Sequence, residues 1–280
     1  MAFFNIFKEK IIEPTIHENE QGLTLFDGAH ILNNCSKVKL DGHAVILESH
    51  NTNYDLVKGK AKIQLLNSGR IVEVGENAKI GHVKDSYIAK VKGKVEITTI
   101  TSSEIDYVVS KAFIRTMNSG SIKFLDDNAK IDTMNNGKIT FVRDNAKIGT
   151  MNNGSIEAIL NSSQISTLNN GKINYVLNKA YIGTINHCTI NEVCDSTEIG
   201  TFADGMVNAI VGNALVCQQT GGKIASKQNW SIVVYAQKKD SKLKSKKKDV
   251  KAKEEAETTE EVMQEEKVEQ TSLLDMEENK

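Results

Sequence analysis

An isoleucine recurs every 17 residues along most of this chain, and no gap or insertion interrupts the series. The column comprises Ile46, Ile63, Ile80, Ile97, Ile114, Ile131, Ile148, Ile165, Ile182 and Ile199, followed by Val216 and Val233. A strict period over so many units indicates a repeat architecture, in which each unit stacks on its neighbours. Units of this length are too short for a helix pair, a propeller blade or a leucine-rich repeat.

A second column lies eight residues after the first, so each unit divides into two halves that read small–x–Ile–x–x–apolar. It comprises Ile71, Ile88, Ile105, Ile122, Ile139, Ile156, Ile173, Ile190, Val207 and Ile224. The step from the small residue to Ile has the period of a β-strand, and each half ends in turn-forming Asn, Gly or Asp. The pattern predicts an all-β fold, a single-stranded parallel β-solenoid of about eleven coils between Ala44 and Trp230.

Stacking identical coils places like residues above one another, because a slip of one residue would turn the apolar set outward. The expected core residues are Ile114, Ile131, Ile148, Ile165, Ile182, Ile122, Ile139, Ile156, Ile173 and Ile190. Asparagines are expected at one corner, where stacked amides bond along the axis and left-handed backbone is tolerated. They form two adjacent columns, Asn118, Asn135, Asn152, Asn169 and Asn186, then Asn136, Asn153 and Asn170.

The chain divides by composition into four segments. Residues 1–19 form a leader, residues 20–43 irregular first coils or a cap, and residues 44–237 the solenoid. Residues 238–280 carry nine Lys and two Asp, followed by eleven acidic residues and two Lys. Blocks of opposite charge with almost no apolar content predict a disordered tail. Within it, residues 270–274, from Gln270 to Leu274, loosely resemble the short peptide that binds bacterial sliding clamps.

Charge and hydropathy exclude several functional classes. The 35 Lys and Arg and 36 Asp and Glu give a net charge of −1, which argues against specific nucleic-acid binding. No run of 18 apolar residues is present, so no membrane-spanning helix is expected. Four cysteines without disulfide spacing favour a reducing, cytoplasmic location. The leader residues Phe3, Phe4, Ile6, Phe7 and Lys8 suit either peripheral contact with an anionic inner-membrane surface or a cap on the first coil.

The sequence offers no catalytic constellation, so neither an enzyme nor a cofactor is expected. Asp127 and Asp144 lie one coil apart, about 5 Å, a separation that suits a retaining glycosidase. Each, however, directly precedes Asn-Ala at a predicted turn, where Asp caps a corner. Cys188 occupies an inward small position near His187 and Cys194, which favours a buried thiol over a zinc ligand. No metal site is predicted.

Four outward aromatic residues fall in one column and form a candidate binding face. They are Tyr107, Phe124, Phe141 and Tyr175, and Ala158 interrupts the series. A binding rod of phage or host origin, which recognises a protein or a carbohydrate, would use such a face. Polymer formation would instead use the ends of the solenoid, whose strands have unpaired edges unless they are capped.

The combination of parts resembles the bactofilins, a family of bacterial polymer-forming cytoskeletal proteins. The resemblance rests on the apolar leader MAFFNIFK at residues 1–8, the solenoid of 17-residue coils and the charged tail. It departs from the family in its coil number and in its Asn-Ala-x-Ile and Asn-Gly-x-Ile steps, where bactofilins carry Gly-x-Ile or Gly-x-Val. The resemblance implies a non-enzymatic scaffold that self-associates end to end; the binding rod is the alternative.

Overall fold

The computed structural model describes residues 13–228 and 231–235, and within them every regular element is a β-strand. The first twelve strands are β1 (Thr15–Glu18), β2 (Thr24–Leu25), β3 (Ala29–Asn33), β4 (Val38–Leu40), β5 (Val45–His50), β6 (Asn53–Val57), β7 (Lys62–Asn67), β8 (Arg70–Val74), β9 (Lys79–Lys84), β10 (Tyr87–Val91), β11 (Glu96–Thr101) and β12 (Ser103–Val108). The remaining strands are β13 (Phe113–Met117), β14 (Gly120–Leu125), β15 (Lys130–Val142), β16 (Lys147–Ile159), β17 (Gln164–Asn169), β18 (Lys172–Val176), β19 (Tyr181–Asn186), β20 (Cys188–Val193), β21 (Glu198–Phe202), β22 (Gly205–Ile210), β23 (Leu215–Gln219), β24 (Lys223–Lys227) and β25 (Ile232–Tyr235).

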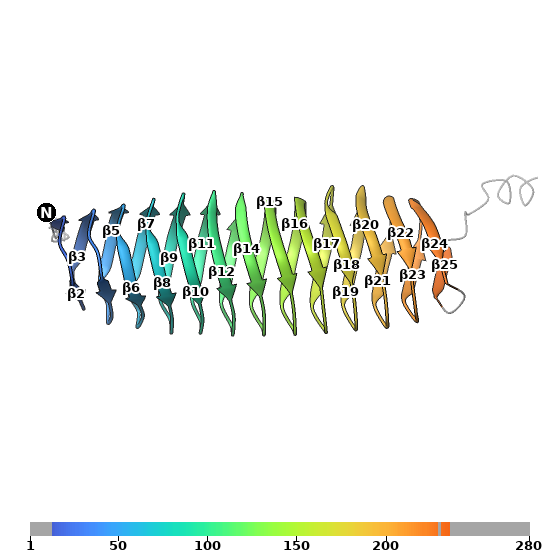
Figure 1. Ribbon diagram of the computed structural model, residues 1–280, viewed down its shortest axis with the longest axis horizontal. Helices are drawn as coiled ribbons and strands as arrows, with labels where there is room; N and C mark the ends of the chain where they lie inside the picture. Colours follow the sequence, from blue (N-terminus) through green and yellow to red (C-terminus); the bar gives the residue numbers. More distant parts are fainter. Residues whose placement is uncertain (1–12, 229–230, 236–280) are drawn as a thin grey trace, which may run out of the picture. The chain divides into compact units, whose positions relative to one another are not determined.

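Each coil of the solenoid contributes two strands, which pair in parallel with the equivalent strands of the coils before and after (Figure 1). The odd-numbered strands β1–β13 and β17–β25 form one face, here face A. The even-numbered strands β2–β14 and β18–β24 form the other, face B. The long strands β15 and β16 run round the corner and belong to both faces. The predicted parallel β-solenoid is therefore confirmed, with about 13 turns.

The additional turns lie before Ala44, where the coils are shorter than 17 residues. Thr15 pairs with His30 at a spacing of 15, and Ala29 pairs with Val45 at 16. From Val45 onward, which pairs with Lys62, the register is 17 residues. Residues 20–43 thus contain β2, β3 and β4. A count based on a fixed period of 17 could not include these coils.

The interior is filled by six residues per coil, three from each half. In one coil these are Ala112, Ile114, Met117, Gly120, Ile122 and Leu125. All ten isoleucines of the predicted core are at most 2% exposed. Full burial of an isoleucine side chain stabilises a fold by about 1.5–3 kcal/mol, so the two ladders are the main source of cohesion.

One corner of every regular coil requires a left-handed residue. Eleven successive coils have φ between 56° and 82° at this point. The residues are Gly42, Gly59, Glu76, Gly93, Ser110, Asp127, Asp144, Asn161, Asn178, Asp195 and Gly212. Gly, Asn and Asp predominate because they adopt this conformation at the lowest cost.

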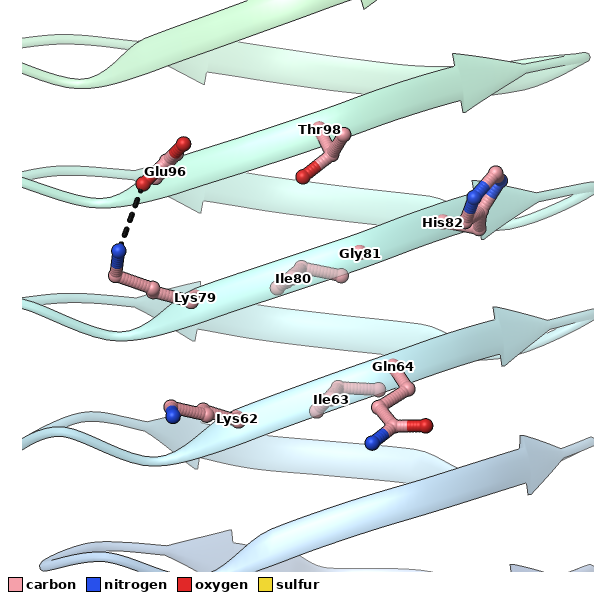
Figure 2. A pocket seen from close by; sticks show the side chains of 9 residues that line it. All are labelled: Lys62, Ile63, Gln64, Lys79, Ile80, Gly81, His82, Glu96 and Thr98. Atoms are coloured by element: carbon pink, nitrogen blue, oxygen red, sulfur yellow. Dashed lines mark hydrogen bonds and ion pairs between the residues drawn. The ribbon is translucent and has the colours of Figure 1, made fainter.

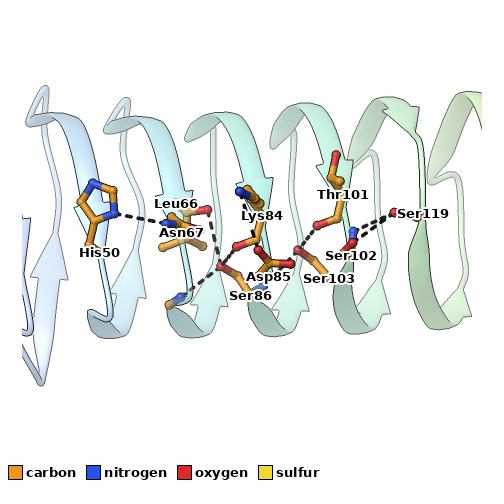
Figure 3. Close-up of polar contacts among 11 residues, drawn as sticks. His50, Leu66, Asn67, Lys84, Asp85, Ser86, Thr101, Ser102, Ser103 and Ser119 are labelled. Carbon is orange, nitrogen blue, oxygen red and sulfur yellow. Dashed lines mark hydrogen bonds and ion pairs between the residues drawn. The ribbon is translucent and has the colours of Figure 1, made fainter.

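At the opposite corner, between a face A strand and the following face B strand, backbone N–H groups donate hydrogen bonds to side chains of the next coil (Figure 3). The hydroxyl of Ser103 accepts a hydrogen bond from the N–H of Ser86 at 3.1 Å, and that of Ser119 accepts from Ser102 at 2.9 Å. Ser86 in turn accepts from the N–H of Gly69 at 3.0 Å. Small hydroxyl residues at this corner therefore complete hydrogen bonding where the strands bend.

The asparagine ladder forms as expected at the same corner. Each amide nitrogen from Asn135 to Asn186 donates to the amide oxygen one coil earlier, at 2.8–3.2 Å. In the adjacent column Asn170 is left-handed, with φ of 50°. Asn136 and Asn153 instead pair with each other inside β15 and β16, because these two strands continue their ladder round the corner.

Candidate functional site

The aromatic column on face B is the most distinctive feature of the outer surface. Tyr107, Phe124 and Phe141 pair in register through β12, β14 and β15. The ring centroids of Tyr107 and Phe124 are 4.9 Å apart, with an angle of 11° between planes. Those of Phe124 and Phe141 are 5.4 Å apart at 15°. The rings therefore stack on one another along the axis and present their edges outward.

The remaining members of the column are separated from this stack. Ala158 follows Phe141 and is only 5% exposed, and Tyr175 follows one coil later and is 42% exposed. Flat sugar rings bind to open aromatic faces, and here the faces of Phe124 are occupied by its neighbours. The geometry suits contact with a protein surface better than stacking against a carbohydrate.

Charged groups hold this column in place. The guanidinium of Arg143 lies 4.5 Å from the ring centroid of Phe124, and Lys123 Nζ lies 5.6 Å from it. Arg143 also binds Asp126, which is 7% exposed, through two hydrogen bonds. Asp126 raises the pKa of Arg143 further above its ordinary value. Phe124 is thus held by contacts with two cations, one of which, the half-buried Arg143, is itself fixed by the buried Asp126.

A second outward column, which the sequence reasoning missed, runs beside the aromatic one. It contains the half-buried apolar residues Val109, Leu160, Leu177 and Val211. Because residues i and i+2 of a strand point to the same side, Tyr107 adjoins Val109 and Tyr175 adjoins Leu177. Pairs of outward apolar residues two positions apart are the signal that could have revealed this strip.

Asp127 and Asp144 lie in the left-handed corner column. Asp127 Oδ2 accepts a hydrogen bond from the backbone N–H of Ser110 at 2.9 Å, one coil earlier. Asp144 Oδ1 accepts from the amide of Asn161 at 2.9 Å. Asp195 and Asn178 repeat the first contact at 2.9 Å. Corner support between coils accounts for these carboxylates.

The cysteines and histidines do not converge. No cluster of three His, Cys, Asp or Glu residues suited to a metal ion occurs in residues 13–228 and 231–235. The buried thiol of Cys188 donates to the carbonyl of Asn186 at 3.0 Å and accepts from the N–H of Gly171 at 3.2 Å. Burial raises the pKa of Cys188, and burial with the nearby Glu192 raises that of Cys194 to about 12. Both thiols are therefore protonated at neutral pH.

A shallow depression of about 440 Å³ lies on face A around Gly81 (Figure 2). It exists because Gly81 has no side chain between Gln64 and Thr98, and a Cβ there would lie 2.5 Å from the carbonyl oxygen of Gln64. At its edge Glu96 pairs with Lys79 at 2.9 Å, and Arg115 also binds Glu96 at 3.1 Å. The depression is open and shallow, and Glu96 at its edge is paired with both Lys79 and Arg115.

The two ends of the described solenoid expose apolar side chains beside strand edges. At one end β1 and β2 each pair on one side only within residues 13–228 and 231–235, and Ile16 and Phe26 are 60% and 56% exposed. At the other, β24 and β25 also pair on one side only among the described strands. Ile232, Val234 and Tyr235 are 60%, 50% and 63% exposed there.

Two further predictions lie outside the described residues: the leader contact of Phe3, Phe4, Ile6, Phe7 and Lys8, and the clamp-like peptide from Gln270 to Leu274. Among the residues that are described, none belongs to a helix long and apolar enough to cross a bilayer. Comparison of the chain with protein-family models, with curated proteins and with solved structures finds no match.

Proposed function

We propose that this protein is a non-enzymatic, bactofilin-like scaffold whose solenoids associate end to end into a polymer. The observation that carries the proposal is a pair of strand edges without a partner among the described strands, β1 at one end and β25 at the other, on the same face. Both are four-residue strands that pair in parallel, so β1 of a second copy can continue the ladder beyond β25. Edges of this kind are templates for strand pairing between chains.

The exposed apolar residues beside these edges support the same conclusion. Ile16 and Phe26 at one end would be covered by Ile232, Val234 and Tyr235 of the preceding copy. A head-to-tail contact of this type does not close on itself, so it generates a filament. We place the polymer in the cytoplasm, with the leader as its contact with an anionic inner-membrane surface.

Blocking one end at a time tests the proposal. Ile16→Lys should block the first end and Val234→Lys the second, because lysine on an edge strand opposes pairing. Each variant alone should show rods of one solenoid length by electron microscopy, and an equimolar mixture should show rods of double length, joined through the two free ends. Val72→Lys, at a residue of β8 that is 48% exposed and lies several coils from either end, is the matched control and should still form filaments by electron microscopy.

Two results would contradict the head-to-tail model. If the wild-type chain stays monomeric at high concentration, end-to-end association is ruled out. Rods of double length formed by Ile16→Lys alone would show instead that like ends meet.

The alternative, a rod that binds another protein, is favoured by the exposed ring edges of the aromatic column. Phe124→Ser with Phe141→Ser would abolish capture of such a partner and leave filament formation unchanged. Loss of filaments in this double variant would instead assign the column to self-association.

A further inference from the structure

Three pairs of oppositely charged outward residues on face B stand at equal distances before and after one coil, that of residues 138–143. Coils at equal distances before and after this centre carry residues of opposite charge in the same column. One coil away, Lys123 corresponds to Glu157; two coils away, Glu104 corresponds to Lys172; three coils away, Lys90 corresponds to Glu192. Strand pairing keeps these six residues in register, because the strands that carry them succeed one another on this face. The strands are β10, β12, β14, β15, β16, β18 and β20.

None of these six side chains forms an ion pair within the described part of the chain, although eleven ion pairs occur there. Lys90, Glu104, Lys123 and Lys172 are exposed, and the two remaining glutamates are half-buried. Glu157 accepts a hydrogen bond from the amide of Asn174 at 2.6 Å, and Glu192 accepts from Cys194 at 3.2 Å, so neither meets a cation.

The apolar residues of the same face follow the same symmetry. Phe124, one coil before the centre, corresponds to the small Ala158 one coil after it. Tyr107 corresponds to Tyr175, and Val109 beside it corresponds to Leu177. Phe141 lies at the centre and corresponds to itself. One large residue therefore opposes a small one, and the other outward aromatic residues oppose aromatic residues, so the apolar column meets itself.

We propose that face B is a lateral interface on which a second copy of this chain packs with its axis antiparallel. A two-fold axis that lies in the interface and crosses the rod at Phe141 brings each column against itself with the coil order reversed. It thereby joins Lys123 to Glu157, Glu104 to Lys172 and Lys90 to Glu192, each pair twice. Over these seven coils only a partner with the same coil spacing, about 4.8 Å, stays in step.

The same axis makes one unfavourable contact, which provides a sharp test. It opposes Lys138 and Arg143 to their own copies. Asp126 neutralises Arg143, whereas Lys138 forms no ion pair within the described residues. Replacing Lys138 by Ser, the residue that Ser121 and Ser155 supply in the same column, should therefore strengthen the lateral dimer. If face B were a free surface, or bound an acidic partner, Lys138→Ser would not strengthen dimerisation of the chain.

A charge-swap series measures the pairing. It uses the full-length chain with Ile16→Lys and Val234→Lys, so that end-to-end association does not contribute. Lys123→Glu and Glu157→Lys should each weaken dimerisation at least tenfold by sedimentation equilibrium, because each creates like-charge contacts twice. The double variant should restore it. Additive weakening in the double variant, or no change in any variant, would overturn the proposal.

Site-specific cross-linking tests the same interface in a chain whose end strands are unchanged. In the otherwise wild-type chain with Cys194→Ser and Cys217→Ser, Thr140→Cys should cross-link to its own copy through a short bismaleimide, since packed sheets lie about 10 Å apart. Thr133→Cys is the matched control, because it lies in the same strand, β15, is also half-buried and belongs to face A. Equal cross-linking of both positions would overturn the interface. So would failure of Thr140→Cys to cross-link.

Discussion

Arg143 binds the carboxylate of Asp126, one coil earlier, through Nε to Oδ1 at 2.8 Å and Nη2 to Oδ2 at 2.5 Å. Its guanidinium also covers the ring of Phe124 at 4.5 Å. A single side chain thus neutralises a nearly buried carboxylate and fixes the central ring of the aromatic stack. One and two coils after Arg143, the same column contains Leu160 and Leu177, which carry no charge and form no ion pair.

This comparison predicts an asymmetric response to substitution. Arg143→Leu should lower the free energy of unfolding by about 2 kcal/mol, because it leaves the Asp126 carboxylate buried and unpaired. The double variant Asp126→Leu with Arg143→Leu copies the apolar pattern of Leu160 and Leu177. Its free energy of unfolding should lie within about 1 kcal/mol of the wild-type value. Urea denaturation followed by circular dichroism measures both. A double variant no more stable than Arg143→Leu would show that the ion pair itself stabilises the coil.

The asparagine ladder predicts a dependence on position along the rod. Asn152 makes two ladder contacts, donating to Asn135 at 2.8 Å and accepting from Asn169 at 3.2 Å. Asn118, at the start of the ladder, makes only one, from Asn135 at 2.9 Å. Asn152→Ala should therefore lower the free energy of unfolding by about 1–2 kcal/mol, and Asn118→Ala should lower it by about half as much. Thermal unfolding of the two variants compares them directly, and equal losses would mean that the ladder adds nothing beyond each residue's own turn.

The fold follows from the sequence because one interaction, isoleucine stacked on isoleucine, repeats without insertion from Ile46 onward. Residues 20–43 were expected as irregular first coils or a cap and were not counted as regular coils, because Thr15 and Ala29 pair at spacings of 15 and 16, which a fixed period of 17 does not include. The aromatic column was visible as a list of residues. Its ring stacking, and the adjacent strip of Val109, Leu160 and Leu177, depend on side-chain direction, which strand pairing determines.

Glu96 gives the pH dependence of stability a definite sign. Hydrogen bonds from Lys79 and then Arg115 hold the pKa of Glu96 below its ordinary value. A depressed pKa in the folded state stabilises the fold above the unfolded-state pKa of about 4.3, and this contribution disappears as the pH falls through the folded-state pKa. Glu96→Gln should thus lower the melting temperature at pH 7, by an amount equivalent to about 0.5 kcal/mol, and have little effect at pH 2. A difference that persists at pH 2 would assign the effect to packing.

Asp127 tests whether the corner carboxylates are structural. Its φ of 58° is costly for residues other than Gly, Asn and Asp, and its Oδ2 accepts the backbone N–H of Ser110 at 2.9 Å. Asp127→Ala loses both the tolerance of the left-handed backbone and the hydrogen bond from Ser110. It should lower the free energy of unfolding by about 1–2 kcal/mol. Asp127→Asn retains an acceptor oxygen and tolerance of the left-handed backbone, and should be close to neutral. Asp127→Gly keeps only the backbone freedom, as Gly93 does in its own coil, and should fall between them. Chemical denaturation ranks the three variants; an Asn variant as unstable as the Ala variant would show that the negative charge itself is required.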